Sequence, residues 1–155
     1  MRRADREVTD PVKIRAFLEQ EQILRVGFYD EGEIYIVPVN YGLAWEKGRT
    51  VFYFHGALAG RKYELAKASP KVGFEIDGDY RLQAHELACK YSAAFQSVIG
   101  AGTLRLVEDD AEKRFGLSRV MKQASGREDW QFPDEAVRNV AVFRLDAENL
   151  TCEAK

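Results

Sequence analysis

Most of the strand-like segments in this chain are separated by turns too short to hold a helix. Asp30-Glu31-Gly32, Glu46-Lys47-Gly48 and Asp77-Gly78-Asp79 have the composition of such turns. A tight turn joins only antiparallel strands, because parallel neighbours need a long crossover. The turns therefore favour an antiparallel sheet. A doubly wound parallel sheet would need a regular alternation of strands and helices, which this chain lacks.

The whole chain has the pattern of a mainly β fold with peripheral helices. Strands are predicted over residues 23–29, 34–45, 51–55, 71–76, 95–108 and 140–145, and helices over residues 10–21, from residue 61 to before Pro70, and behind Asp109. Residues 125–135 are predicted to be a polar loop and 151–155 a tail, while 84–93 show no clear period. Six strands linked mainly by short turns favour a closed antiparallel barrel, and 155 residues suit a single domain.

A few residues inside these segments constrain the fold further. Pro38 cannot donate to a sheet ladder, so its strand should be an edge strand or carry a bulge. Gly100 and Gly102 in one strand indicate either a bend of the barrel or the close approach of a ligand. Asp109 followed by Glu112 resembles a capping box at the start of a helix.

The composition argues against several functional classes. A net charge of −2 disfavours nucleic-acid binding, which usually needs a basic surplus. No apolar run approaches the ~20 residues of a membrane span, and the charged start of the chain shows no signal peptide. Cys89 and Cys152 form no C-x-x-C pattern, so we expect free thiols in a reducing cytoplasm. With two histidines and no H-E-x-x-H sequence, we expect no metal site.

Residues 50–67 have the pattern of a strand, a glycine-bearing loop and a short helix. Gly56 and Gly60 allow the loop to bend and to approach a ligand closely. Arg61 and Lys62 then begin the helix, although the helix dipole makes that end positive and favours anions there. A bound phosphate would resolve the conflict, because free N–H groups and both cations could converge on it. In the alternative interpretation, the two side chains simply point into water.

Several stretches of the chain together form a more specific pattern. They are Met1-Arg2-Arg3, Asp5-Arg6-Glu7, Val37-Pro38-Val39-Asn40-Tyr41-Gly42, Tyr53-Phe54-His55-Gly56-Ala57, Gly60-Arg61-Lys62, Pro70-Lys71-Val72, Phe74-Glu75-Ile76-Asp77 and Ser97-Val98-Ile99-Gly100-Ala101-Gly102. Their order and spacing resemble the split-barrel flavoproteins related to pyridoxamine 5′-phosphate oxidase, and are most similar to the nitroimidazole-resistance branch. The resemblance implies a six-stranded antiparallel split β-barrel that binds FMN as a homodimer, in two clefts at the subunit interface.

The resemblance also implies which residues contact the cofactor. Arg61 and Lys62 would hold the FMN phosphate. The isoalloxazine ring and the ribityl chain would contact Val39, Asn40, Tyr41, Phe54, His55, Gly56, Ser97 and Val98. Trp130, in the C-terminal loop, would lie near the flavin of the partner subunit. Simpler interpretations remain open: Asn40 could cap a turn, Ser97 could satisfy a neighbouring strand, and Trp130 could anchor its loop.

His55 is the candidate catalytic residue. Histidine titrates near neutral pH, so His55 could supply a proton to a reduced substrate or help to bind that substrate. The alternative is a packed or surface histidine at the end of a strand. Hydride transfer itself needs no protein acid or base, because the flavin carries that chemistry. His85 and Cys89 are interpreted as structural or incidental.

The function implied by the resemblance is that of an FMN-dependent oxidoreductase. Electrons would pass from NAD(P)H to a small acceptor such as a nitroaromatic compound. One alternative is an FMN-binding module without turnover, serving storage or sensing. A true pyridoxamine-phosphate oxidase would need a second basic cluster for the substrate phosphate, and the sequence shows none. A further alternative is a split barrel that binds haem.

Overall fold

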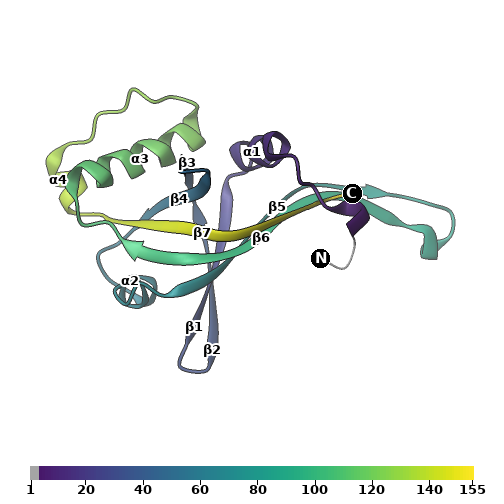
Figure 1. Ribbon diagram of the computed structural model, residues 1–155, viewed down its shortest axis with the longest axis horizontal. Coiled ribbons are helices and arrows are strands. Elements are labelled where there is room, and N and C mark those ends of the chain that lie inside the picture. The colour runs from purple at the N-terminus through teal and green to yellow at the C-terminus, as the bar shows by residue number, and fades with distance from the viewer. Residues whose placement is uncertain (1–3) are drawn as a thin grey trace.

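Seven strands form a single antiparallel sheet in the computed structural model, which describes residues 4–155 (Figure 1). They are β1 (Ile23–Asp30), β2 (Glu33–Asn40), β3 (Gly42–Glu46), β4 (Arg49–Gly56), β5 (Lys71–Gln83), β6 (Ser92–Leu106) and β7 (Ala141–Ala154), in the sheet order β2-β1-β5-β6-β7-β4-β3. The predicted mainly β split barrel is confirmed. Residues 1–3, the first stretch of the resemblance, lie outside the described part of the chain.

The strand count is seven rather than the predicted six, because the segment predicted as one strand over residues 34–45 breaks at Tyr41. The Tyr41 side chain is 1% exposed, and its hydroxyl donates a hydrogen bond to the carbonyl oxygen of Leu18 (2.6 Å). At Gly42, a Cβ atom would overlap the backbone of Arg119. The break places the consecutive strands β2 and β3 at opposite edges of the sheet, so the sheet curls around its core. β2 is therefore an edge strand, as its proline predicted.

Strand β4 is buried on both of its faces. Phe52 and Phe54 point into the main core of the barrel. Val51 and Tyr53 point the other way, into a second apolar cluster that includes Val120 of helix α3 (Asp110–Ser125). Successive side chains of a strand face opposite sides of the sheet. A strand that is covered on both sides therefore appears in the sequence as a continuous apolar run.

Short helices surround the sheet. In the described range they are α1 (Pro11–Gln20), α2 (Arg61–Ala66), α3 and α4 (Asp134–Arg138), with 3-10 turns η1 (Ala4–Arg6) and η2 (Ala88–Lys90). Asp10 and Asp109 cap α1 and α3 as predicted, since each carboxylate accepts a hydrogen bond from a backbone N–H of the first turn. α4 lies partly in the segment predicted as a polar loop. Among residues 4–155, no helix has the length and apolarity needed to cross a membrane.

The last strand is longer than predicted. β7 pairs with β6 as far as Ala154, which lies opposite Gln96, so most of the predicted tail at residues 151–155 belongs to the sheet. The register of this pair shifts after Ala101. A Cβ atom at Gly102 would overlap the carbonyl oxygen of Asp146. The glycines of β6 therefore allow the close approach of β7.

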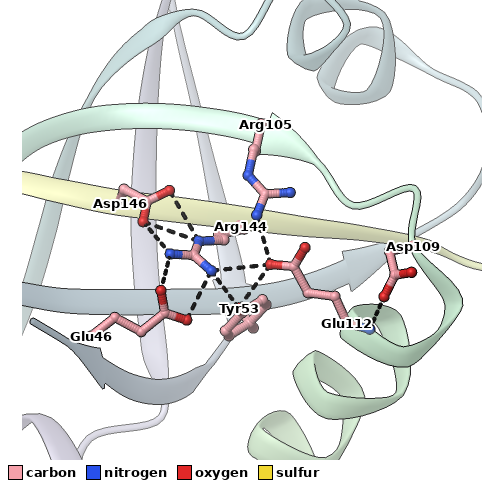
Figure 2. A network of polar contacts seen from close by, with 7 residues as sticks. All are labelled: Glu46, Tyr53, Arg105, Asp109, Glu112, Arg144 and Asp146. Atoms are coloured by element: carbon pink, nitrogen blue, oxygen red, sulfur yellow. Dashed lines mark hydrogen bonds and ion pairs between the residues drawn. The ribbon is translucent and has the colours of Figure 1, made fainter.

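A polar network joins α3 to the outer face of the sheet (Figure 2). Arg144 on β7 donates hydrogen bonds to the carboxylates of Glu46 (2.7 Å), Asp146 (2.7 Å) and Glu112 (3.1 Å). Glu112 also accepts a hydrogen bond from the Tyr53 hydroxyl (3.0 Å), so its side chain binds the sheet instead of completing the predicted capping box. Partial burial opposes ionisation of Glu112, but hydrogen bonds from two arginines and Tyr53 lower its pKa. Burial raises the pKa of Tyr53 to about 12.

Replacing Arg144 by methionine is expected to lower the free energy of unfolding by about 2–3 kcal/mol, because three carboxylates lose the cation that they share. The Arg144 side chain is only 13% exposed. Urea unfolding followed by circular dichroism measures the loss. Arg25→Met is the matched control, because Arg25 also binds two carboxylates but is 44% exposed, and its loss should cost at most about 1 kcal/mol. Equal losses in the two variants would contradict a special contribution of Arg144.

Candidate functional site

The candidate site lies where β4 ends and the chain enters α2. The strand, loop and helix predicted over residues 50–67 are all present. Residues 57–60 form an exposed loop between them. Gly60 has a φ of +100°, a backbone conformation that residues with a side chain rarely adopt. The local chain therefore turns sharply in front of Arg61 and leaves the loop open to solvent.

Lys62 lies along the end of β4. Its Nζ is 5.6 Å from the ring centroid of Phe54 and 5.1 Å from that of Phe143, two rings that stack on each other. A Cβ atom at Gly56 would lie 3.0 Å from this Nζ, so glycine makes room for the lysine side chain. Partial burial lowers the pKa of Lys62. Among the ion pairs of residues 4–155 none involves Lys62, so its half-buried ammonium is the group at the site that an anion would stabilise most.

Arg61 points in a different direction from Lys62. Its Nε donates a hydrogen bond to Asp30 (2.7 Å) and its Nη2 donates one to Glu33 (3.0 Å). The guanidinium carbon also lies 4.8 Å from the ring centroid of Tyr35. All three partners belong to the β1–β2 hairpin. The two cations that were predicted to converge on one anion therefore diverge in the structure, and Arg61 is already paired.

His55 stands at the end of β4, opposite Val142 of β7. Its side chain is exposed overall, but partial burial of the ring and the nearby Lys62 ammonium both lower its pKa. The imidazole is therefore neutral at pH 7 and can both donate and accept a hydrogen bond. Phe54 precedes it with its side chain in the core, so only His55 of this pair offers a side chain to a ligand outside the barrel.

The side chains of residues 39–41 are engaged within the fold. Val39 is buried in the core, and the Tyr41 hydroxyl is bound to Leu18 as described above. The Asn40 amide donates a hydrogen bond to the carbonyl oxygen of Gln22 (3.2 Å). Burial raises the pKa of Tyr41, which keeps its phenol protonated. This segment can therefore offer mainly its backbone to a ligand.

Ser97 and Val98 lie far from His55 within one copy of the chain. Ser97 pairs opposite Glu153 of β7, whereas His55 pairs opposite Val142 of the same strand. The two β7 residues are eleven positions apart, which corresponds to roughly 36 Å at about 3.3 Å per residue. Strand β7 also lies between β6 and β4 in the sheet, so Ser97 and His55 are not on neighbouring strands within one copy. Val98 is fully buried, so its side chain belongs to the core.

Trp130 lies in the loop between α3 and α4. Its indole Nε1 donates a hydrogen bond to the Ser125 hydroxyl (3.2 Å), and the Arg127 guanidinium stacks over its ring at 4.5 Å. In one copy of the chain these contacts anchor the loop to the end of its own helix. Figure 1 shows this loop beyond α3, on the side of the helix away from α2.

Sequence reasoning missed the acidic residues of the β1–β2 hairpin. Asp30 is the first residue of the predicted turn at residues 30–32 and Glu33 follows it, but an acidic turn is a common feature of protein surfaces. Only the curvature of the sheet brings this turn to α2. The charged residues around Arg61 therefore had no distinctive signal in the sequence.

A separate open cavity of about 680 Å³ lies between α1, β3 and α3. Its lining includes Trp45, on which the Arg15 guanidinium stacks at 4.0 Å, and Arg119, which pairs with Glu128 (2.7 Å). Trp45 lies at the end of the β3–β4 hairpin away from His55. The cavity is therefore distinct from the candidate site, and its arginines already have acidic or aromatic partners.

Two comparisons cover nearly the whole chain. The model of a family described as pyridoxamine 5′-phosphate oxidase matches residues 10–154. Among solved structures, a candidate 5-nitroimidazole antibiotic resistance protein from Bacteroides thetaiotaomicron is similar, with a TM-score of 0.80 and 28% sequence identity. The alignment covers 96% of this chain and 86% of that one.

Two other solved structures share the fold at lower identity. The flavocytochrome Anf3 from Azotobacter vinelandii aligns with a TM-score of 0.80 and 20% identity, over 100% of this chain and 72% of that one. An FAD and haem binding protein from Mycobacterium smegmatis aligns with a TM-score of 0.82 and 13% identity, over 97% and 73%. A comparison with curated proteins found no match.

Proposed function

Because this chain belongs to the pyridoxamine 5′-phosphate oxidase family, we propose that it binds FMN and passes electrons from NAD(P)H to a small acceptor such as a nitroaromatic compound. The observation that carries the proposal is the half-buried ammonium of Lys62, which forms no ion pair with residues 4–155. It lies where the resemblance implies the cofactor phosphate. The 28% identity to a candidate 5-nitroimidazole resistance protein supports the choice of acceptor.

The residues of the site fit a flavin phosphate. Lys62 offers an ammonium that lacks a carboxylate partner within the described residues, and Arg61 offers a guanidinium on the preceding residue. The exposed loop at residues 57–60 gives a ligand access to both. When bound, FMN supplies the electron-transfer chemistry, and the protein supplies binding and orientation. The backbone of residues 39–41 would then face the polar edge of the ring, because the side chains there are engaged in the fold.

We further propose that the working form is a homodimer. Ile34, Ile36, Tyr80, Leu82 and Ile99 are large apolar residues that one copy leaves exposed on the sheet. Exposed apolar surface of this kind marks an interaction site. One copy also keeps the implied site residues Ser97 and Trp130 away from Lys62. A two-fold dimer would allow one subunit to contribute residues to the site of the other.

The test uses the full chain, purified without added flavin. Its visible spectrum should show bound FMN, and light scattering of the coloured fraction should give the mass of two chains. NAD(P)H oxidation should then depend on added nitroaromatics or quinones. A colourless protein that does not bind added FMN would overturn the proposal. FMN binding without turnover would reduce it to a storage or sensing module, and a stable monomer that retains FMN would remove the dimer.

A His55→Ala variant is expected to keep FMN but to turn over at least about tenfold more slowly, because a positioned acid contributes about a hundredfold or more. The pKa of His55 is lowered from the usual histidine value of about 6.5. The imidazolium that can donate a proton therefore forms only at a pH below that value. Turnover of the wild type should therefore rise as pH falls through the lowered pKa, and this rise should vanish in the variant. His85→Ala is the control. Unchanged rates with every acceptor would return His55 to a structural role.

A further inference from the structure

We propose that Asp30 and Glu33 compete with the flavin phosphate for Arg61, and that they thereby set the affinity of the site for phosphorylated flavins. This inference rests on the proposed function and adds two residues to it. Both residues belong to the β1–β2 hairpin, at the end where the chain turns.

The geometry of the Arg61 contacts is the first support. Arg61 uses Nε for Asp30 and Nη2 for Glu33, so both carboxylates occupy N–H donors of the same guanidinium. Carboxylate and phosphate groups bind the same planar set of N–H donors on the arginine guanidinium. Tyr35 packs against the guanidinium as well, which holds it on the hairpin. A phosphate can gain the full set of Arg61 donors only after these contacts are given up.

The balance of charge around the site is the second support. Asp30, Glu31 and Glu33 place three carboxylates within four residues of the hairpin, against two cations on α2. Of those two cations, only Lys62 is free of a carboxylate partner among residues 4–155. An FMN phosphate carries further negative charge, so carboxylates close to it oppose its binding. The hairpin therefore weakens phosphate binding in two ways, by occupying Arg61 and by repulsion.

This arrangement predicts an effect that depends on the phosphate. Riboflavin carries the same ring and ribityl chain as FMN but no phosphate, so it does not compete for Arg61. Removing the two negative charges should strengthen FMN binding and leave riboflavin binding unchanged. Coupling between two interactions is reciprocal at equilibrium. Bound FMN should therefore loosen the contact between Arg61 and the hairpin.

The experiment compares the wild type with an Asp30→Asn, Glu33→Gln double variant as full chains freed of flavin. Titration with FMN, followed by flavin fluorescence, should show about tenfold tighter binding by the variant, the size expected when two partly exposed ion pairs no longer compete. Riboflavin affinity should stay within about twofold. Glu31→Gln is the control for repulsion alone, because it removes a charge from the same turn without touching an Arg61 contact, and it should tighten FMN binding less than the double variant does. Glu33→Gln alone serves if the double variant does not fold, since Glu33 is 74% exposed.

Two results would overturn the inference. If FMN affinity is unchanged or weaker in the variant, the carboxylates position Arg61 for the phosphate and do not compete with it. If both flavins gain affinity equally, the effect does not pass through the phosphate. A wild-type protein that binds neither flavin is a different outcome, because it overturns the proposed function itself.

Discussion

An Arg61→Ala, Lys62→Ala double variant is expected to fold normally and to bind FMN about two to four orders of magnitude more weakly than the wild type. Both substitutions remove charge-assisted hydrogen bonds to the phosphate, which are the strong ones in binding sites. Lys62 should account for the larger part, because it has no carboxylate partner to exchange in the described part of the chain. Arg61 contributes less, since it must first leave Asp30 and Glu33.

Fluorescence titration of the flavin-free proteins measures this loss, and riboflavin shows whether it depends on the phosphate. Lys67→Ala is the matched control, because Lys67 lies at the other end of α2 and pairs with Glu64 (2.6 Å). Thermal unfolding of the flavin-free forms should differ little, whereas added FMN should protect only the wild type. Equal FMN affinity of wild type and double variant would mean that the phosphate binds elsewhere.

A Gly42→Ala substitution is expected to destabilise the fold by about 3 kcal/mol or more, which corresponds to a fall in Tm of roughly 6–12 °C for a chain of this size. The added Cβ would overlap the backbone of Arg119 in α3. A backbone cannot move aside as a flexible side chain does. The helix would therefore shift away from β3 and lose packing against the apolar cluster beneath it.

Gly73→Ala is the control for the general cost of replacing a strand glycine. A Cβ atom at Gly73 would meet only the carbonyl oxygen of Gly100, at 4.0 Å, which is ordinary contact. Its Tm should stay within about 3 °C of the wild type, because alanine restricts the unfolded chain and fits the strand. Differential scanning calorimetry of the wild type and of both variants measures these Tm values. Equal Tm values for Gly42→Ala and wild type would show that α3 does not rest tightly on Gly42.

Much of the fold could be predicted because the signals are local. The turn at residues 30–32 and the apolar run of β4 lie within a few residues, and both appear in the structure as expected. The caps of α1 and α3 are equally local, since each joins neighbours in the sequence. Local signals could not decide that the segment over residues 34–45 divides into two strands, because the close approach at Gly42 involves a helix that lies about eighty positions later in the chain.

The candidate site could be predicted only in part. The loop with Gly56 and Gly60, followed by Arg61 and Lys62, was recognised from spacing and from resemblance. Its actual charge pattern depends on contacts between distant segments: Asp30 lies thirty-one positions before Arg61, yet it forms the shortest ion pair of that arginine. Likewise, Glu112 was expected to complete a capping box on α3, but its carboxylate accepts a hydrogen bond from Arg144.

The sequence by itself predicted most of the strands, the turns at residues 30–32 and 46–48, and the positions of the cations, because alternation of side chains and turn chemistry act over a few residues. The turn predicted at residues 77–79 was wrong, because these residues lie inside β5. The tertiary structure alone decided that Arg61 pairs with carboxylates and that Lys62 pairs with none of those in residues 4–155. Curling of the sheet carries the acidic β1–β2 hairpin to Arg61, while packing on aromatic rings holds Lys62 away from every carboxylate of residues 4–155. Electrostatic pairing depends on distance in space, and only the folded sheet sets that distance.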